Sequence, residues 1–132
     1  MSDEEEIREL LARYCFALDA ERFDDMAALF TADGVWETAF GTGTGRDGIV
    51  AQARSIASGD RPRRVHLTTN TVIDIVAEST ATVQSNWVLF QNSDKGPVIS
   101  SGGAYFDHLA KEGGRWFFRH RRIDRYVREG GE

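Results

Sequence analysis

The chain has 132 residues, of which 41% are hydrophobic, and a formal net charge of −5 at pH 7. This length predicts a single domain, residues 1–132, with a substantial hydrophobic core. The acidic balance argues against a nucleic-acid-binding protein, and no apolar run is long enough to span a membrane. The acidic first residues lack the basic and then apolar pattern of a signal peptide, so we expect a cytoplasmic protein. Cys15 is the single cysteine, which excludes an intrachain disulfide.

The first predicted helix runs from about Asp3 to Ala20. Its apolar residues recur at intervals of three and four, as in an amphipathic helix: Ile7, Leu10, Leu11, Tyr14, Cys15 and Leu18. Ser2 and Glu5 are typical of a capping box at a helix start. Asp19 lies in the same i, i+4 row as Cys15, so its carboxylate points toward the buried side. Because an unpaired carboxylate is costly at the edge of an apolar stripe, we expect the rest of the chain to supply a partner.

Shorter elements follow this helix. A second, short helical stripe consists of Phe23, Met26, Ala27 and Phe30. Residues 31–34 are predicted to end it, and residues 35–38 to begin a strand. The glycine-rich segment Gly41–Gly45 lacks the lysine of a phosphate-binding loop, so we interpret it as a flexible loop. A third helix is predicted to open at Arg46–Gly48 and to end at residues 58–62.

From Arg63 onward, the apolar period changes to two, which is typical of β-strands. Four long strands are predicted, at Val65–Val76, Thr80–Gln91, Ile99–Leu109 and Trp116–Tyr126. Short turns join them, which favours an antiparallel meander. Three helices followed by such a sheet predict an α+β domain, in which a strongly curved, mostly antiparallel sheet encloses a pocket against the helices.

Several segments carry a family resemblance, namely Ala12–Asp19, Phe23–Gly34, His66–Asn70, Gly102–Asp107 and Gly114–Phe118. Together they resemble SnoaL-like proteins of the nuclear-transport-factor-2-like superfamily. The resemblance covers nearly the whole chain and implies a cone-shaped α+β barrel. It is more specific for the fold than for an activity, because this fold is used by enzymes and non-enzymes alike.

Two enzyme types in that superfamily, scytalone dehydratase and hexachlorocyclohexane dehydrochlorinase, pair an aspartate at the end of the first helix with a histidine on a strand. Asp19 and His66 fall at the matching positions. The resemblance implies that Asp19 fixes the imidazole tautomer and that His66 takes a proton from carbon. The chain also departs from the dehydratase: its two tyrosines correspond to Leu18 and Thr38, and its second histidine falls near Gly103. The part of that site that assists the leaving group is therefore missing or replaced.

Ketosteroid isomerase supplies a second match. Tyr14 lies where that enzyme has its oxyanion-hole tyrosine, and Asp107 resembles its protonated aspartate. The position of its catalytic base corresponds to Thr38, with Glu37 one residue away and on the opposite face of the strand. This resemblance therefore provides hydrogen-bond donors without a base, and it leaves Asp19 unexplained.

Each candidate residue also has a purely structural interpretation. Asp19 is also suited to cap a helix beginning near Arg22, which is the more common role for an aspartate at a helix end. His66 is equally consistent with a structural histidine on a strand, hydrogen-bonded to neighbouring residues. Tyr14 is equally consistent with an aromatic residue of the core. Asp107 is equally consistent with a salt bridge to an arginine of the last strand. No trio of histidine and carboxylate residues has convincing metal-ligand spacing.

These observations predict a lyase or isomerase of the SnoaL-like type, without a cofactor or metal, that acts on a small hydrophobic, polyketide-, aromatic- or steroid-like substrate. The expected catalytic residues are His66 as general base, Asp19 as its orienting partner and Tyr14 as hydrogen-bond donor. The expected substrate-binding residues are Trp36, Trp87, Phe90, Tyr105, Asp107, Phe118 and Arg121. A homodimer or higher homo-oligomer is expected. The alternative is a non-catalytic small-molecule-binding or dimerisation domain of the same fold.

Overall fold

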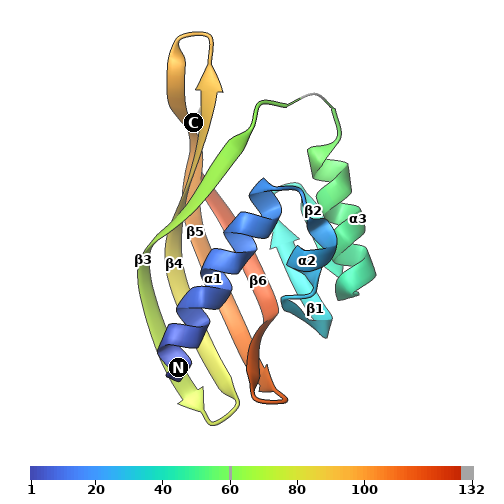
Figure 1. Ribbon diagram of the computed structural model, residues 1–132, viewed down its shortest axis with the longest axis vertical. Helices are drawn as coiled ribbons and strands as arrows, with labels where there is room; N and C mark the ends of the chain where they lie inside the picture. The colour runs from blue at the N-terminus through green and yellow to red at the C-terminus, as the bar shows by residue number, and fades with distance from the viewer. Residues whose placement is uncertain (60, 129–132) are drawn as a thin grey trace.

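Three helices form one layer of the protein, and Figure 1 shows α1 lying across one face of the sheet. The computed structural model describes residues 1–59 and 61–128. The helices are α1 (Asp3–Asp19), α2 (Phe23–Ala27) and α3 (Gly45–Ala57). The capping box of α1 is confirmed, because the Glu5 N–H donates to Ser2 Oγ at 3.1 Å and the Ser2 N–H donates to Glu5 Oε1 at 3.1 Å. Among the described residues, no helix is long and apolar enough to cross a membrane.

The second layer is a six-stranded sheet in the order β2-β1-β6-β5-β4-β3. Its strands are β1 (Phe30–Thr38), β2 (Gly41–Thr44), β3 (Arg64–Ala77), β4 (Thr80–Ser93), β5 (Gly96–Glu112) and β6 (Arg115–Arg128). Only the contact between β1 and β6 is parallel among these strand pairs of the described chain. The predicted α+β architecture with a mostly antiparallel sheet is therefore confirmed, and the four long strands lie where the period of two predicts them.

The segment before α3 differs from the prediction. Phe30 belongs to β1 and not to the second helix, because it pairs with Phe118 of β6, far away in the sequence. The glycine-rich segment is not a loop, since Gly41–Thr44 forms an antiparallel strand against the end of β1. At Gly43 a side chain would lie 2.7 Å from the carbonyl oxygen of Gly48, so this close approach of strand and helix requires glycine. The predicted end of the third helix, residues 58–62, includes residue 60, which lies outside the described residues.

The hydrophobic core lies between the inner stripe of α1 and the inner face of the sheet. Ile7 and Tyr14 of α1 are completely buried, and the inward residues of β4 alternate with exposed or half-buried ones. Burying one large apolar side chain contributes about 1.5–3 kcal/mol, so this layer contact is the main stabilising feature of the fold. At the start of α1, Asp3 Oδ1 accepts hydrogen bonds from Lys111 Nζ and Trp116 Nε1, at 3.0 and 2.9 Å. These bonds fix the helix to the turn between β5 and β6.

Candidate functional site

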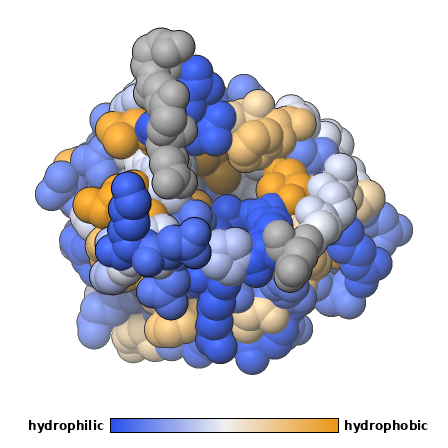
Figure 2. Space-filling view, turned by 90° about the horizontal axis from the view of Figure 1, so that it is seen from above, coloured by the Kyte–Doolittle hydropathy of each residue, from blue (hydrophilic) through white to orange (hydrophobic). Residues whose placement is uncertain are grey.

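A pocket opens at the end of the protein where α1 stops and the chain returns from α3 to the sheet. Figure 2 views this end and shows a hollow with apolar residues in its floor. The pocket has a volume of about 130 Å³. Apolar and aromatic side chains form most of its wall: Leu18, Trp36, Phe40, Trp87, Leu89 and Tyr105. A concave apolar surface with a few polar groups is typical of a small-molecule site.

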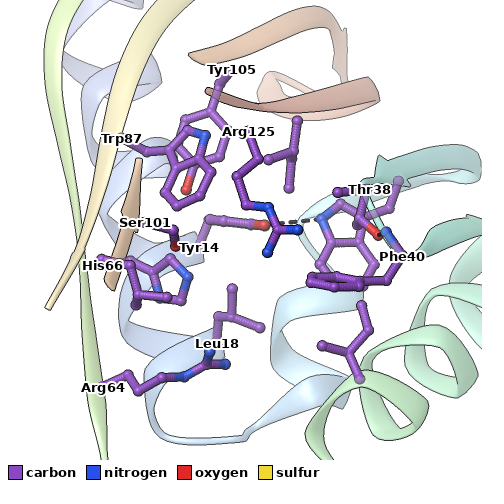
Figure 3. A pocket seen from close by; sticks show the side chains of 15 residues that line it. Tyr14, Leu18, Thr38, Phe40, Arg64, His66, Trp87, Ser101, Tyr105 and Arg125 are labelled. Carbon is purple, nitrogen blue, oxygen red and sulfur yellow. Dashed lines mark hydrogen bonds between the residues drawn. The ribbon is translucent and has the colours of Figure 1, made fainter. Parts of the chain in front are cut away.

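Asp19 and His66, which are 47 positions apart in the sequence, meet at one side of this pocket. His66 Nδ1 lies 2.6 Å from Asp19 Oδ1, and the His66 backbone N–H donates to both carboxylate oxygens at 3.0 and 3.2 Å. The two side chains are only 12% and 14% exposed. Because the carboxylate accepts a hydrogen bond from Nδ1, the neutral form of the imidazole carries its proton on Nδ1 and has its lone pair on Nε2. The imidazole lines the pocket (Figure 3).

Asp19 does not cap the following helix, which was the structural alternative for this residue. The helix α2 begins after Arg22 without any side-chain capping hydrogen bond. The carboxylate of Asp19 instead joins the end of α1 to the start of β3. The sequence predicts that Asp19 needs a partner, and His66 provides it through both its backbone and its side chain.

Tyr14 projects from α1 toward the pocket floor, where its oxygen accepts a hydrogen bond from Trp36 Nε1 at 2.9 Å, as Figure 3 shows. Burial raises the pKa of the Tyr14 phenol well above its usual value, although the positive charge of Arg121 and the bond from Trp36 oppose this rise. The phenol therefore stays protonated. Because Trp36 uses a lone pair of the oxygen, the Tyr14 O–H is left to donate.

Beneath the pocket floor, Arg121 and Asp107 form a completely buried ion pair. Arg121 Nε and Nη2 donate to the two carboxylate oxygens of Asp107 at 2.8 and 3.2 Å. The guanidinium lies 3.6 Å from the ring centre of Tyr105, 4.2 Å from that of Tyr14 and 4.6 Å from that of Phe118. Burial raises the pKa of the Asp107 carboxyl, and Arg121 opposes the rise. This ion pair therefore supports both tyrosine rings from below.

The structure places the predicted substrate-binding residues in three different environments. Trp36, Trp87 and Tyr105 line the pocket. Phe118, Asp107 and Arg121 are buried beneath it, and none of them is among the described residues that line it. Phe90 is also absent from this lining among the described residues, because it lies one position after the inward-facing Leu89 and strand alternation turns it to the outer face of β4.

Two positions at which the resemblance implies a departure from the dehydratase lie in the pocket. Leu18 and Thr38, expected to correspond to its two tyrosines, both line it. At Gly103, near which the resemblance implies the second histidine of the dehydratase, a Cβ atom would lie 1.9 Å from the carbonyl oxygen of Asp124. No side chain fits there without separating β5 from β6. Among the residues that the structure describes, no group of three or more His, Cys, Asp or Glu side chains is arranged to hold a metal ion.

Sequence reasoning missed several lining residues, namely Phe40, Arg64, Ser101 and Arg125. Ser101 lies on the inward face of β5, where it pairs with Leu89 of β4. A small polar residue of this kind does not stand out in the sequence as a pocket residue. Arg64 and Arg125 belong to arginine-rich segments near strand ends. Charged residues at such positions are usually exposed to solvent, so the sequence does not point to a pocket. Their position in the pocket depends on the curvature of the sheet and not on any local pattern.

The fold and the site define a small α+β protein that holds an aromatic pocket, with a histidine–aspartate pair, between its helices and a curved sheet. Residues 1–122 match the family model of the SnoaL-like domain, and the chain therefore belongs to the SnoaL-like family. The resemblance seen in the sequence is thereby confirmed. A search of curated protein sequences found no match.

Solved structures agree with this assignment. A variant of Rv3472, a protein of unknown function from Mycobacterium tuberculosis, is 30% identical with a TM-score of 0.85, over 94% of this chain and 72% of that chain. A Nostoc punctiforme protein of unknown function with a cystatin-like fold is 22% identical with a TM-score of 0.85, over 94% and 91% of the two chains. A candidate scytalone dehydratase from Novosphingobium aromaticivorans is 26% identical with a TM-score of 0.80, over 95% and 85%.

Proposed function

We propose that this protein is a cofactor-independent lyase or isomerase that removes a proton from carbon in a small, largely apolar substrate. The observation that carries the proposal is the contact between His66 Nδ1 and Asp19 Oδ1 at 2.6 Å, on the wall of an apolar pocket. The contact leaves Nε2 of His66 as a base that faces the pocket. The similarity to a candidate scytalone dehydratase supports the same class of chemistry.

The proposed reaction begins when His66 Nε2 takes a proton from a carbon next to a carbonyl group. The electron pair of the broken C–H bond moves toward the carbonyl oxygen, where Tyr14 donates its O–H to the developing negative charge. The imidazolium formed is stabilised by Asp19. In an isomerisation, the proton returns to a different carbon. In an elimination, a hydroxyl group on the next carbon leaves with that proton as water.

The alternative proposal, a non-catalytic binding or dimerisation domain, predicts a pocket without an available base. Two features favour the enzyme. The space beside His66 is open, with a volume of about 130 Å³, and it is not filled by side chains. In addition, a half-buried carboxylate that orients an imidazole is an arrangement suited to general-base catalysis, and such pairs cluster at functional sites.

Proton abstraction can be tested before the natural substrate is found. The protein is incubated in deuterium oxide with bicyclic ketones such as tetralone and chromanone, and proton NMR follows the loss of the signal next to the carbonyl. A bicyclic β-hydroxyketone tests elimination in parallel. We expect exchange or water loss faster than in buffer alone for at least one compound. If compounds bind in the pocket and none of them exchanges or eliminates water, the binding-domain alternative is favoured.

We also propose a homodimer that forms through the outer face of the sheet. This face exposes large apolar side chains: Val65, Leu67, Val72, Val76 and Ile99 are each between 42% and 66% exposed. Large apolar side chains exposed on one face of a sheet are typical of a protein–protein contact. Light scattering at micromolar concentration should give about twice the 14.8 kDa mass of one chain, and Leu67→Glu should reduce it. A wild-type mass equal to one chain contradicts this proposal.

A further inference from the structure

Two arginines from strands that are not neighbours in the sheet both line the pocket. Arg64 comes from the start of β3 and Arg125 from the end of β6, and both side chains are half-buried in its lining. In Figure 3 the guanidinium group of Arg125 lies beside Phe40, and that of Arg64 lies beside Leu18. Among the described residues, no aspartate or glutamate lines this pocket. This local positive charge contrasts with the net charge of −5 for the whole chain.

Two carboxylates beside the pocket have other partners. Asp19 is held by His66, and Asp124, which precedes Arg125, accepts from Arg122 Nε at 3.2 Å and from the Tyr126 hydroxyl at 3.3 Å. Among the described residues Arg125 forms no ion pair, and its guanidinium lies 4.9 Å from the ring centre of Phe40. Within residues 1–59 and 61–128, the guanidinium of Arg64 makes no ion pair.

A half-buried cation without a counter-charge is unfavourable, because desolvation is not offset by an ion pair. Two such cations in one apolar pocket are therefore unexpected in a site for a neutral hydrocarbon. Arg64 also lines two adjoining surface grooves. One holds Arg61 and Arg63 together with the acidic Asp19 and Glu21. The other holds Arg61 and, among the described residues, no Asp or Glu. Arginines outnumber carboxylates in both grooves, so a net positive charge continues outward from the pocket and would attract an anion toward the opening.

We propose that Arg64 and Arg125 bind a carboxylate group on the aromatic substrate of this site. The inference rests on the proposed function, since it names the substrate class of the same pocket. The guanidinium group is planar and presents paired N–H donors that match a carboxylate. With the carboxylate held near the opening, the apolar ring lies against Trp36 and Trp87. The reacting carbon is then directed inward, toward His66.

The experiment compares naphthoate with naphthamide, its uncharged equivalent, by isothermal titration calorimetry at neutral pH. Wild-type protein should bind naphthoate about 10- to 100-fold more tightly, the range expected for hydrogen bonds to a charged group. The double variant Arg64→Gln/Arg125→Gln should reduce this preference to less than about threefold while naphthamide affinity is unchanged. Arg119→Gln is the matched control, because it removes the same charge from an exposed position of β6 and should keep the preference.

Three results overturn the inference: equal affinities for the two compounds in the wild-type protein, a preference that survives in the double variant, and no binding of either compound at millimolar concentration. Naphthyl phosphate distinguishes the kind of anion, and tighter binding of it than of naphthoate overturns the assignment to a carboxylate. Because His66→Gln should retain the naphthoate preference, loss of catalysis and loss of anion binding are separate outcomes. A protein that shows the preference but no deuterium exchange contradicts only the proposed function.

Discussion

His66→Ala is expected to lower kcat for carbon deprotonation by about 10²- to 10⁴-fold, the usual loss when a general base is removed. The substitution deletes Nε2, the base that faces the pocket, and leaves the aromatic wall in place. It is measured as the rate of deuterium exchange or water loss with whichever compound of the panel is turned over by the wild-type protein.

The structure explains why this variant should remain folded. Asp19 accepts hydrogen bonds from the backbone N–H of residue 66 at 3.0 and 3.2 Å, and these bonds do not need the imidazole. Tyr14→Phe is the comparison variant and should lower kcat by less, because it removes one donor and keeps the shape of the pocket. A folded His66→Ala protein with full activity would exclude the proposed mechanism. An unchanged thermal transition should accompany the loss of activity.

Arg121→Met is expected to lower the free energy of unfolding by about 3–5 kcal/mol, as is typical when one member of a buried ion pair is removed. Asp107 would then remain completely buried without its bidentate partner. The total stability of a domain is only about 5–15 kcal/mol, so this single change would remove a large part of it. Urea denaturation at neutral pH measures the effect.

Two controls separate charge burial from lost packing. Arg122→Met, on the same strand, breaks an exposed ion pair with Asp124 and should cost less than about 1 kcal/mol. The double variant Arg121→Met/Asp107→Leu should recover much of the loss, because apolar residues often replace a buried ion pair without cost. An Arg121→Met variant no less stable than Arg122→Met would contradict the prediction.

The Arg121→Met variant should also depend on pH in a defined direction. Burial already raises the pKa of Asp107, and Arg121 opposes this rise, so its removal should raise the pKa further. A carboxyl group whose pKa is higher in the folded state favours folding when protonated, and that contribution is lost as the pH rises. The deficit relative to the wild-type protein should therefore be smaller near pH 4 and larger near pH 7, across about the titration range of such a group.

The sequence alone predicts those site residues that conflict with the pattern of their own helix or strand. Asp19 interrupts the apolar stripe of the first helix, and this conflict requires a partner whatever the tertiary structure is. Tyr14 is likewise placed on the inner face of the helix by periodicity alone. Strand alternation, in contrast, cannot decide which set of residues points inward. Alternation places Trp87 and Phe90 on opposite faces of β4, and only the tertiary structure shows that Trp87 is the one that lines the pocket among the described residues.

The sequence by itself determined the elements whose periodicity is long and regular, namely α1 and the four strands from β3 to β6. Tertiary structure decided the remaining features, because they depend on contacts between distant segments. Phe30 is extended because β6 supplies a parallel partner, and Gly41–Thr44 becomes a strand because β1 is already in the sheet. Arg64 and Arg125 are 61 positions apart, and they meet at one pocket only because the curved sheet brings the start of β3 and the end of β6 around the same opening.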